Sequence, residues 1–127
     1  MSDKHTALSI SQMARETGVS VDTLRYYERE QLLVAPVGRT GSDRRVYGAR
    51  DVGWVNFITR LRRTGMGIAD IREYTRLARL GERTNPERLA LLEAHRMRVI
   101  AQLEETQSSL DAITYKIAEY SRKVASL

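Results

Sequence analysis

Residues 8–33 read LSISQMARETGVSVDTLRYYEREQLL and give the clearest indication of the fold. Its apolar residues are spaced for two short helices joined by a tight turn. Ser11 can cap the first helix, Gly18 can end it, and Ser20 can cap the second. This pattern is typical of a helix-turn-helix, so we expect a mainly α fold.

The second helix of this motif has a face that suits a nucleic acid. Val19 and Leu24 occupy the two positions of a hydrophobic staple, and Tyr27 points to the same side as Leu24 at about 100° per residue. The opposite face carries Asp22, Thr23 at its margin, Arg25, Tyr26 and Arg29. Arginine donates to guanine edges and phosphates, so this face is suited to a DNA major groove. The alternative is a solvated amphipathic helix.

Residues 37–48, VGRTGSDRRVYG, place Gly and Ser in a turn between two short β-prone pieces. We expect a small β-hairpin, or wing, beside the helix-turn-helix. Its three arginines would grip phosphates that flank the groove, with an affinity that falls as salt rises. A solvated basic loop is the alternative. Two further helices are expected, at 50–63 and 68–80.

A long helix is predicted after residue 85. Asn85 can cap it and Pro86 can stand at its first position, and neither Gly nor Pro occurs beyond. Apolar residues then alternate at spacings of three and four, the period of a coiled coil, with Arg96 and Thr106 as polar seam positions. The residues expected at the dimer interface are Leu89, Leu92, Val99, Leu103, Leu110, Ile113, Ile117, Tyr120 and Val124.

The length of this seam predicts a homodimer. The sequence has no second helix of similar length to cover it, and an intrachain hairpin would need a break near its middle that the sequence lacks. We therefore expect two parts: residues 1–80, a winged-helix domain with connecting helices, and residues 81–127, a coiled-coil dimerisation helix with a short C-terminal tail.

Composition limits the classes of protein further. The chain has 127 residues, 42% of them hydrophobic and 29% charged, which is an ordinary globular balance. No apolar run approaches the roughly 20 residues that cross a bilayer, and the N-terminus lacks a secretory signal, so a cytoplasmic, nucleoid-associated protein is expected. The absence of cysteine removes disulfides and thiolate metal sites. We expect neither metal nor cofactor.

The positive charge lies in the N-terminal half. The net charge is +5; residues 1–64 hold eleven Lys and Arg against seven Asp and Glu, whereas residues 85–127 hold six of each. A modest basic excess is weak support for a polyanion partner by itself. It gains weight because it coincides with the helix-turn-helix and the basic hairpin.

Several motifs together resemble the MerR family of bacterial transcriptional regulators. The most specific is TLRYYE at residues 23–28, accompanied by SISQMA at 9–14, RRVY at 44–47 and RTGMGI at 63–68. The resemblance covers nearly the whole chain. It implies a winged helix-turn-helix DNA-binding domain, a connecting helix pair and an antiparallel coiled-coil dimer that presents two heads to one face of a duplex.

The resemblance also implies roles for residues and partners. The residues expected to bind DNA are Ser20, Asp22, Thr23, Arg25, Tyr26, Tyr27, Arg39, Arg44, Arg45, Tyr47 and Arg60. Regulators of this family bend and untwist an over-long promoter spacer so that RNA polymerase can engage, at a cost of the order of a few kcal/mol. A pure repressor or an architectural DNA-binding protein of the same fold is the alternative.

The chain departs from the family pattern in its wing and in its sensing residues. SDRR at 42–45 stands where a Gly-Tyr-Arg-like step is usual. These 127 residues contain no cysteine of the kind that metal-sensing and redox members use, and we expect no added ligand domain of the kind that multidrug members carry. The segment 95–120 is similar to the short aldehyde- or stress-responsive branch.

Four aromatic residues could line an effector pocket or simply pack: Trp54, Tyr74, Tyr115 and Tyr120.

Two other classes of protein share parts of this pattern. An enzyme is not expected, because neither His5 nor His95 has neighbours that form a catalytic or metal constellation. A coiled-coil adaptor whose basic head docks on an acidic protein would share the charge pattern. Salt-sensitive binding to duplex DNA separates a regulator from this adaptor.

Overall fold

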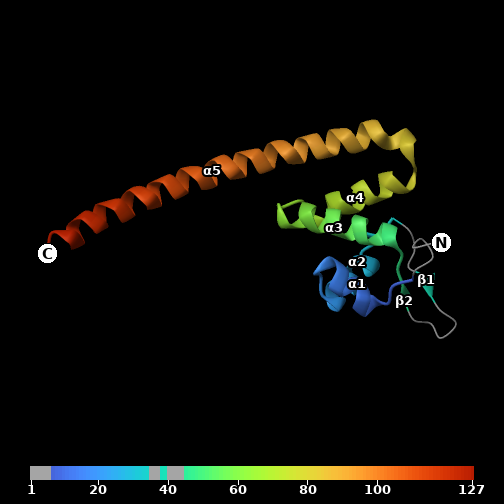
Figure 1. Cartoon of the computed structure of the whole chain (residues 1–127). Coiled ribbons are helices and arrows are strands. Elements are labelled where there is room, and N and C mark those ends of the chain that lie inside the picture. Colours follow the sequence, from blue (N-terminus) through green and yellow to red (C-terminus); the bar gives the residue numbers. More distant parts are fainter. Residues whose placement is uncertain (1–6, 35–37, 40–44) are drawn as a thin grey trace. The chain divides into compact units, whose positions relative to one another are not determined.

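The computed structural model describes residues 7–34, 38–39 and 45–127, with no description of the side chains of Arg39 and Arg45. The chain divides into two units, Met1–Leu91 and Leu92–Leu127. Its elements, labelled in Figure 1, are α1 (Ile10–Thr17), α2 (Val21–Arg29), β1 (Gly38–Arg39), β2 (Arg45–Val46), α3 (Ala49–Arg63), α4 (Ile68–Arg79), the short 3-10 helix η2 (Glu82–Thr84) and α5 (Asn85–Ala125).

The two helices of the helix-turn-helix begin and end at local caps. Ser20 caps α2 by accepting from Thr23 N at 3.0 Å, and Gly18, with φ +70°, ends α1, so both predictions are confirmed. The predicted cap at Ser11 is wrong. Ser9 Oγ accepts from Gln12 N while Gln12 Oε1 accepts from Ser9 N, at 3.1 and 2.7 Å. This reciprocal capping box satisfies two otherwise unpaired N–H groups, so α1 starts earlier.

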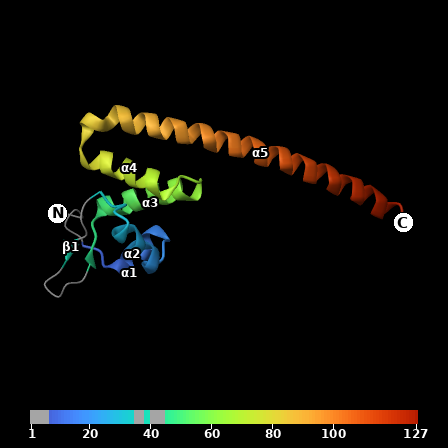
Figure 2. The same cartoon turned by 180° about the vertical axis from the view of Figure 1, so that it is seen from behind.

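The core of the first unit forms where the helix-turn-helix packs on α3. Met13 of α1, Leu24 of α2 and Val55 of α3 have no exposed surface, and Ile71 of α4 has only 1%. Both views place α3 between the α1–α2 pair and α4 (Figures 1 and 2). The central position of α3 means that its two faces orient the elements on either side.

The wing is anchored to the segment that precedes α1. In the antiparallel pair of β1 and β2, Gly38 is opposite Val46 and Arg39 is opposite Arg45. Leu8 and Tyr47 exchange two backbone hydrogen bonds of 2.8 Å, and Tyr47 is buried. The expected hairpin is confirmed at its base. Its turn, with Arg44, lies outside the described residues.

The long C-terminal helix is confirmed, with a different start from the one predicted. Asn85 already has helical dihedral angles, φ −54° and ψ −41°, so it does not cap α5. Thr84 Oγ1 donates to Leu77 O at 2.6 Å and holds η2 in place, and α5 continues directly from that turn. Asn85 Oδ1 accepts instead from Arg88 Nη2. None of the helices in the described segments is long and apolar enough to span a membrane.

We predict opposite effects for alanine at two glycines of the first unit. An added Cβ would meet no atom within 4 Å at either Gly18 or Gly53, so the backbone conformation decides the outcome. Gly18→Ala should cost about 1 kcal/mol of unfolding free energy because of its positive φ. Gly53→Ala, inside α3, should stabilise by up to about 1 kcal/mol. Urea denaturation measures both, and equal effects would contradict the assigned conformations.

Candidate nucleic-acid interface

The outer face of α2 begins with a loosely paired arginine. Arg25 Nη1 lies 3.6 Å from Asp22 Oδ1, and the two side chains are 50% and 94% exposed. A surface ion pair of this kind is worth about 1 kcal/mol or less. Arg25 can therefore exchange Asp22 for a base edge or a phosphate at little cost.

Tyr26 makes two cation–π contacts, one within α2 and one to α3. The guanidinium carbon of Arg29 lies 5.5 Å from the centroid of its ring, and that of Arg62, on α3, lies at 5.2 Å. Such contacts contribute about 0.5–1 kcal/mol each at exposed sites. The half-buried ring thus keeps two positive groups close to the outer face of α2.

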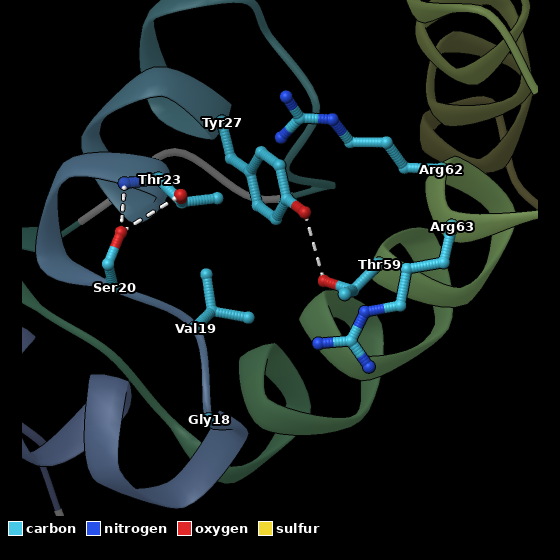
Figure 3. A pocket seen from close by; sticks show the side chains of 8 residues that line it. All are labelled: Gly18, Val19, Ser20, Thr23, Tyr27, Thr59, Arg62 and Arg63. Carbon is cyan, nitrogen blue, oxygen red and sulfur yellow. Dashed lines mark hydrogen bonds between the residues drawn. The ribbon is translucent and has the colours of Figure 1, made fainter. Parts of the chain in front are cut away.

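Tyr27, the next residue, points to the opposite side. Its side chain is only 1% exposed, and its hydroxyl is hydrogen-bonded to Thr59 Oγ1 of α3 at 3.0 Å (Figure 3). Arg62 also lies against this ring, with its guanidinium carbon 6.0 Å from the centroid. The Tyr27–Thr59 bond therefore sets how α2 is rotated on α3.

A pocket of about 380 Å³ lies where the start of α2 meets the end of α3 (Figure 3). Its lining residues are Gly18, Val19, Ser20, Thr23, Tyr27, Thr59, Arg62 and Arg63. This lining contains two arginines and no carboxylate. The N-terminus of a helix presents unpaired N–H groups and a positive dipole end, so this combination favours an anion such as a phosphate group.

The structure brings together only part of the set predicted to bind DNA. Ser20, Asp22, Thr23, Arg25 and Tyr26 lie on the start and the outer face of α2. Tyr27 and Tyr47 are buried, with 1% exposure each. Arg60 is exposed on α3 and is not among the residues that line the pocket. Arg39 and Arg45 belong to the wing strands, and Arg44 lies outside the described residues.

Sequence reasoning missed three residues of α3, namely Thr59, Arg62 and Arg63. They follow the spacing i, i+3 and i+4, which places them on one helical face. That spacing was visible in the sequence. Nothing local, however, shows that this face of α3 meets α2, whereas Arg60 falls on another face.

The four aromatic residues considered for an effector pocket fall in different units. Trp54 and Tyr74 stack with centroids 5.6 Å apart and planes 6° apart, and burial raises the pKa of Tyr74. This mutual packing accounts for both rings. Tyr115 and Tyr120, in the second unit, are 66% and 59% exposed. An effector site made from all four stays a prediction.

A capped helix with a basic outer face beside a β wing defines a winged helix-turn-helix DNA-binding protein. The model of the MerR HTH family of regulatory proteins matches residues 8–77, and a second model, described as MerR, DNA binding, matches residues 52–115. The chain belongs to the MerR family. It is a DNA-binding transcriptional regulator, and its family is one of regulators and not of enzymes.

Several relatives are similar over most of the chain. An uncharacterized HTH-type transcriptional regulator of Haemophilus influenzae is 35% identical over 112 residues, 88% of this chain and 82% of that protein. The regulator AdhR of Bacillus subtilis is 40% identical over 93 residues, 73% of this chain and 66% of AdhR. The crystal structure of HiNmlR, a MerR family regulator lacking the sensor domain, bound to promoter DNA, has a TM-score of 0.85 with 32% identity and covers 94% of both chains.

We predict that the Tyr27 hydroxyl contributes to stability through Thr59. Tyr27→Phe should lower the unfolding free energy by about 1 kcal/mol, because it leaves the buried Thr59 hydroxyl without this bond. Thr59→Val in the same chain should recover part of that loss, since both partners are then apolar. A double-mutant cycle in urea measures the coupling, and strictly additive effects would contradict the bond.

Proposed function

We propose that the chain binds promoter DNA as a homodimer and bends and untwists the promoter spacer so that RNA polymerase can engage. The observation that carries the proposal is the stack of Arg29, Tyr26 and Arg62 beside the arginine-lined pocket at the start of α2. HiNmlR, which matches nearly the whole chain, was crystallised with promoter DNA and supports this reading.

In this proposal α2 enters the major groove. Arg25, half-exposed at the outer face, reads base edges, and Tyr26 with Arg62 contacts the backbone beside the groove. Ser20 and Thr23 bring their hydroxyls to a phosphate at the positive end of the α2 dipole, while the Thr23 N–H caps the helix. Asp22 releases Arg25 when DNA binds.

The remaining predicted residues divide into wing contacts and positioning residues. Arg39, Arg44 and Arg45 grip phosphates from the wing, and Arg60 makes a peripheral contact. Tyr27 and Tyr47 act through packing, because buried rings hold α2 and the wing in place without themselves reaching the duplex.

The homodimer follows from the apolar seam of α5. Most of its seam residues are widely exposed in one chain: Leu103 is 64%, Ile117 60% and Val124 67% exposed, whereas Leu92 and Val99 are half-buried. Fully burying such a side chain contributes about 1.5–3 kcal/mol, so two α5 helices gain much by pairing. We propose the antiparallel arrangement, with Leu89, Leu92, Val99, Leu110, Ile113 and Tyr120 completing the interface.

The dimer makes DNA deformation possible. Two heads at opposite ends of one antiparallel coil address two half-sites, and a spacer that is too long for polymerase must shorten along its axis to satisfy both. Smooth bending of such a site costs of the order of 1–6 kcal/mol, which the phosphate contacts of both heads offset. We therefore propose that RNA polymerase is the partner that binds the promoter once its spacer has been shortened.

Selection of genomic DNA fragments by the purified protein, followed by in vitro transcription, tests this function. We expect an inverted repeat that spans a promoter spacer, and increased transcript when the protein is added. Repression without activation would favour the repressor alternative. Failure to enrich any duplex in dilute buffer would contradict DNA binding altogether.

We predict that Arg62 is required for DNA affinity. Arg62→Ala should weaken binding about tenfold at moderate salt and reduce the salt slope by about one, since one phosphate contact is lost. Arg76→Ala is the matched control. It removes an exposed arginine that is paired with Glu73 on α4, and it should leave affinity unchanged within about twofold. Gel shifts over a salt series measure both, and equal losses would show only a net-charge effect.

We predict that a charge in the seam separates the dimer. Ile113→Asp should weaken association at least about 100-fold, because two carboxylates would be placed in an apolar interface. Tyr115→Asp, which alters an exposed residue outside the seam, serves as the control. Sedimentation equilibrium measures the dissociation constants. A wild-type protein that sediments as one subunit would exclude the dimer.

A further inference from the structure

The segment Glu30–Val34, which joins α2 to the wing, is held by an uncommon set of bonds. Each of its five backbone carbonyls accepts a hydrogen bond from a side chain of α3 or α4. Trp54 Nε1 donates to Leu32 O at 2.7 Å, and Arg72 Nε donates to Glu30 O at 3.0 Å. We call this segment the linker.

Arg79 of α4 makes three of the five bonds. Its Nη2 donates to Leu33 O at 2.5 Å and to Gln31 O at 3.2 Å, and its Nε donates to Val34 O at 3.1 Å. A guanidinium carries five donors in a rigid fork, so one arginine can fix several carbonyls relative to one another. A lysine ammonium on a flexible stem cannot reproduce this geometry.

The linker backbone needs such support. Gln31 has φ +62° and is the only non-glycine residue with positive φ in the described part of the chain. Leu32 N donates to Tyr27 O at 2.9 Å and Gln31 N to Glu28 O at 3.1 Å, so the left-handed residue ends α2 abruptly. Strained residues of this kind persist where their surroundings hold them.

Arg72 reinforces the same segment from a second side. Besides its bond to Glu30 O, it forms an ion pair with the Glu30 side chain, with Nη2 and Oε1 2.6 Å apart. Cations near the C-terminal end of a helix are favoured by the helix dipole, and Arg72 and Arg79 both lie near the carbonyls that follow α2. The linker is therefore fixed to α4 at both of its ends.

We propose that Arg79 is a positioning residue for the wing, which sets the wing at a fixed distance from α2 so that both engage one duplex. This inference rests on the proposed function. Arg79 is itself exposed, and its donors face the linker carbonyls, while residues such as Leu24 and Ile71 build the core. Loss of Arg79 leaves the head folded and frees the wing on its α2 side only, because the pairing of Leu8 with Tyr47 still holds its second strand. The phosphate contacts of the wing are therefore weakened, while those of α2 remain.

The test compares Arg79→Ala and Arg79→Lys with Arg76→Ala, the exposed arginine one turn away on α4 that bonds Glu73. The probe is a duplex selected by the wild-type protein from a random-sequence pool, and affinity is measured over a salt series. Both Arg79 variants should bind about tenfold more weakly, with a salt slope lower by at least about one. Arg76→Ala should match the wild type.

We expect Arg79→Ala and Arg79→Lys to lose the same DNA affinity, and this equality distinguishes a positioning residue from one that contacts a phosphate. Where an arginine itself contacts a phosphate, lysine restores affinity because it keeps the charge. Positioning several carbonyls requires the planar guanidinium with its five donors, which lysine lacks. A double-mutant cycle adds a second criterion: in a chain with Arg39→Ala, Arg44→Ala and Arg45→Ala, which lacks all three wing arginines, Arg79→Ala should change affinity by less than about twofold.

Several results would overturn the inference. They are wild-type affinity and slope in Arg79→Ala, rescue by Arg79→Lys, an additive loss in the wing-depleted chain, or an equal loss in Arg76→Ala. A variant that fails to fold by circular dichroism would show that Arg79 supports the whole head, which also overturns it. Failure of the wild-type protein to select any duplex would instead contradict the proposed function.

Discussion

Burial of one face of α2 against α3 is the constraint on which the DNA-facing surface depends. Leu24 and Tyr27 are removed from solvent, and the Tyr27 hydroxyl is bonded to Thr59. Because successive helical side chains turn by about 100°, burying this face directs Arg25 and its neighbours outward. The residues that read DNA in our proposal are therefore oriented by residues that never reach it.

The same helix that receives α2 also supplies charge to its outer surface. On α3, Thr59 bonds the buried tyrosine while Arg62, three residues later, reaches the ring of Tyr26. Arginines of α4 donate hydrogen bonds to the linker that follows α2. The recognition helix α2 and the linker are therefore both held in place by α3 and α4. The apolar seam of α5 imposes a separate requirement, since its exposed residues gain free energy only by meeting a partner.

Much of the fold could be predicted because its signals are local. Gly18 at a left-handed position, Ser20 as a cap and the 3.5-residue period of α5 each follow from neighbouring residues alone. The two wrong caps show the limit of that reasoning. Ser9 and Ser11 both suit a cap, and the reciprocal partner Gln12 decides for Ser9. Asn85 does not cap α5 because its own dihedral angles are already helical. The bond from Thr84 to Leu77 fixes the preceding turn η2, from which α5 continues.

The helices, the base of the wing, the basic face of α2 and the apolar seam follow from the order of residues alone, since each depends on periodicity or turn chemistry within one segment. The packing of the helices, which no local pattern shows, puts Arg62 and Arg63 beside α2, bonds Tyr27 to Thr59, and brings Arg79 to carbonyls 45 to 48 residues earlier in the chain. Periodicity shows which face of a helix is apolar. Which distant side chains meet that face depends on how the helices pack.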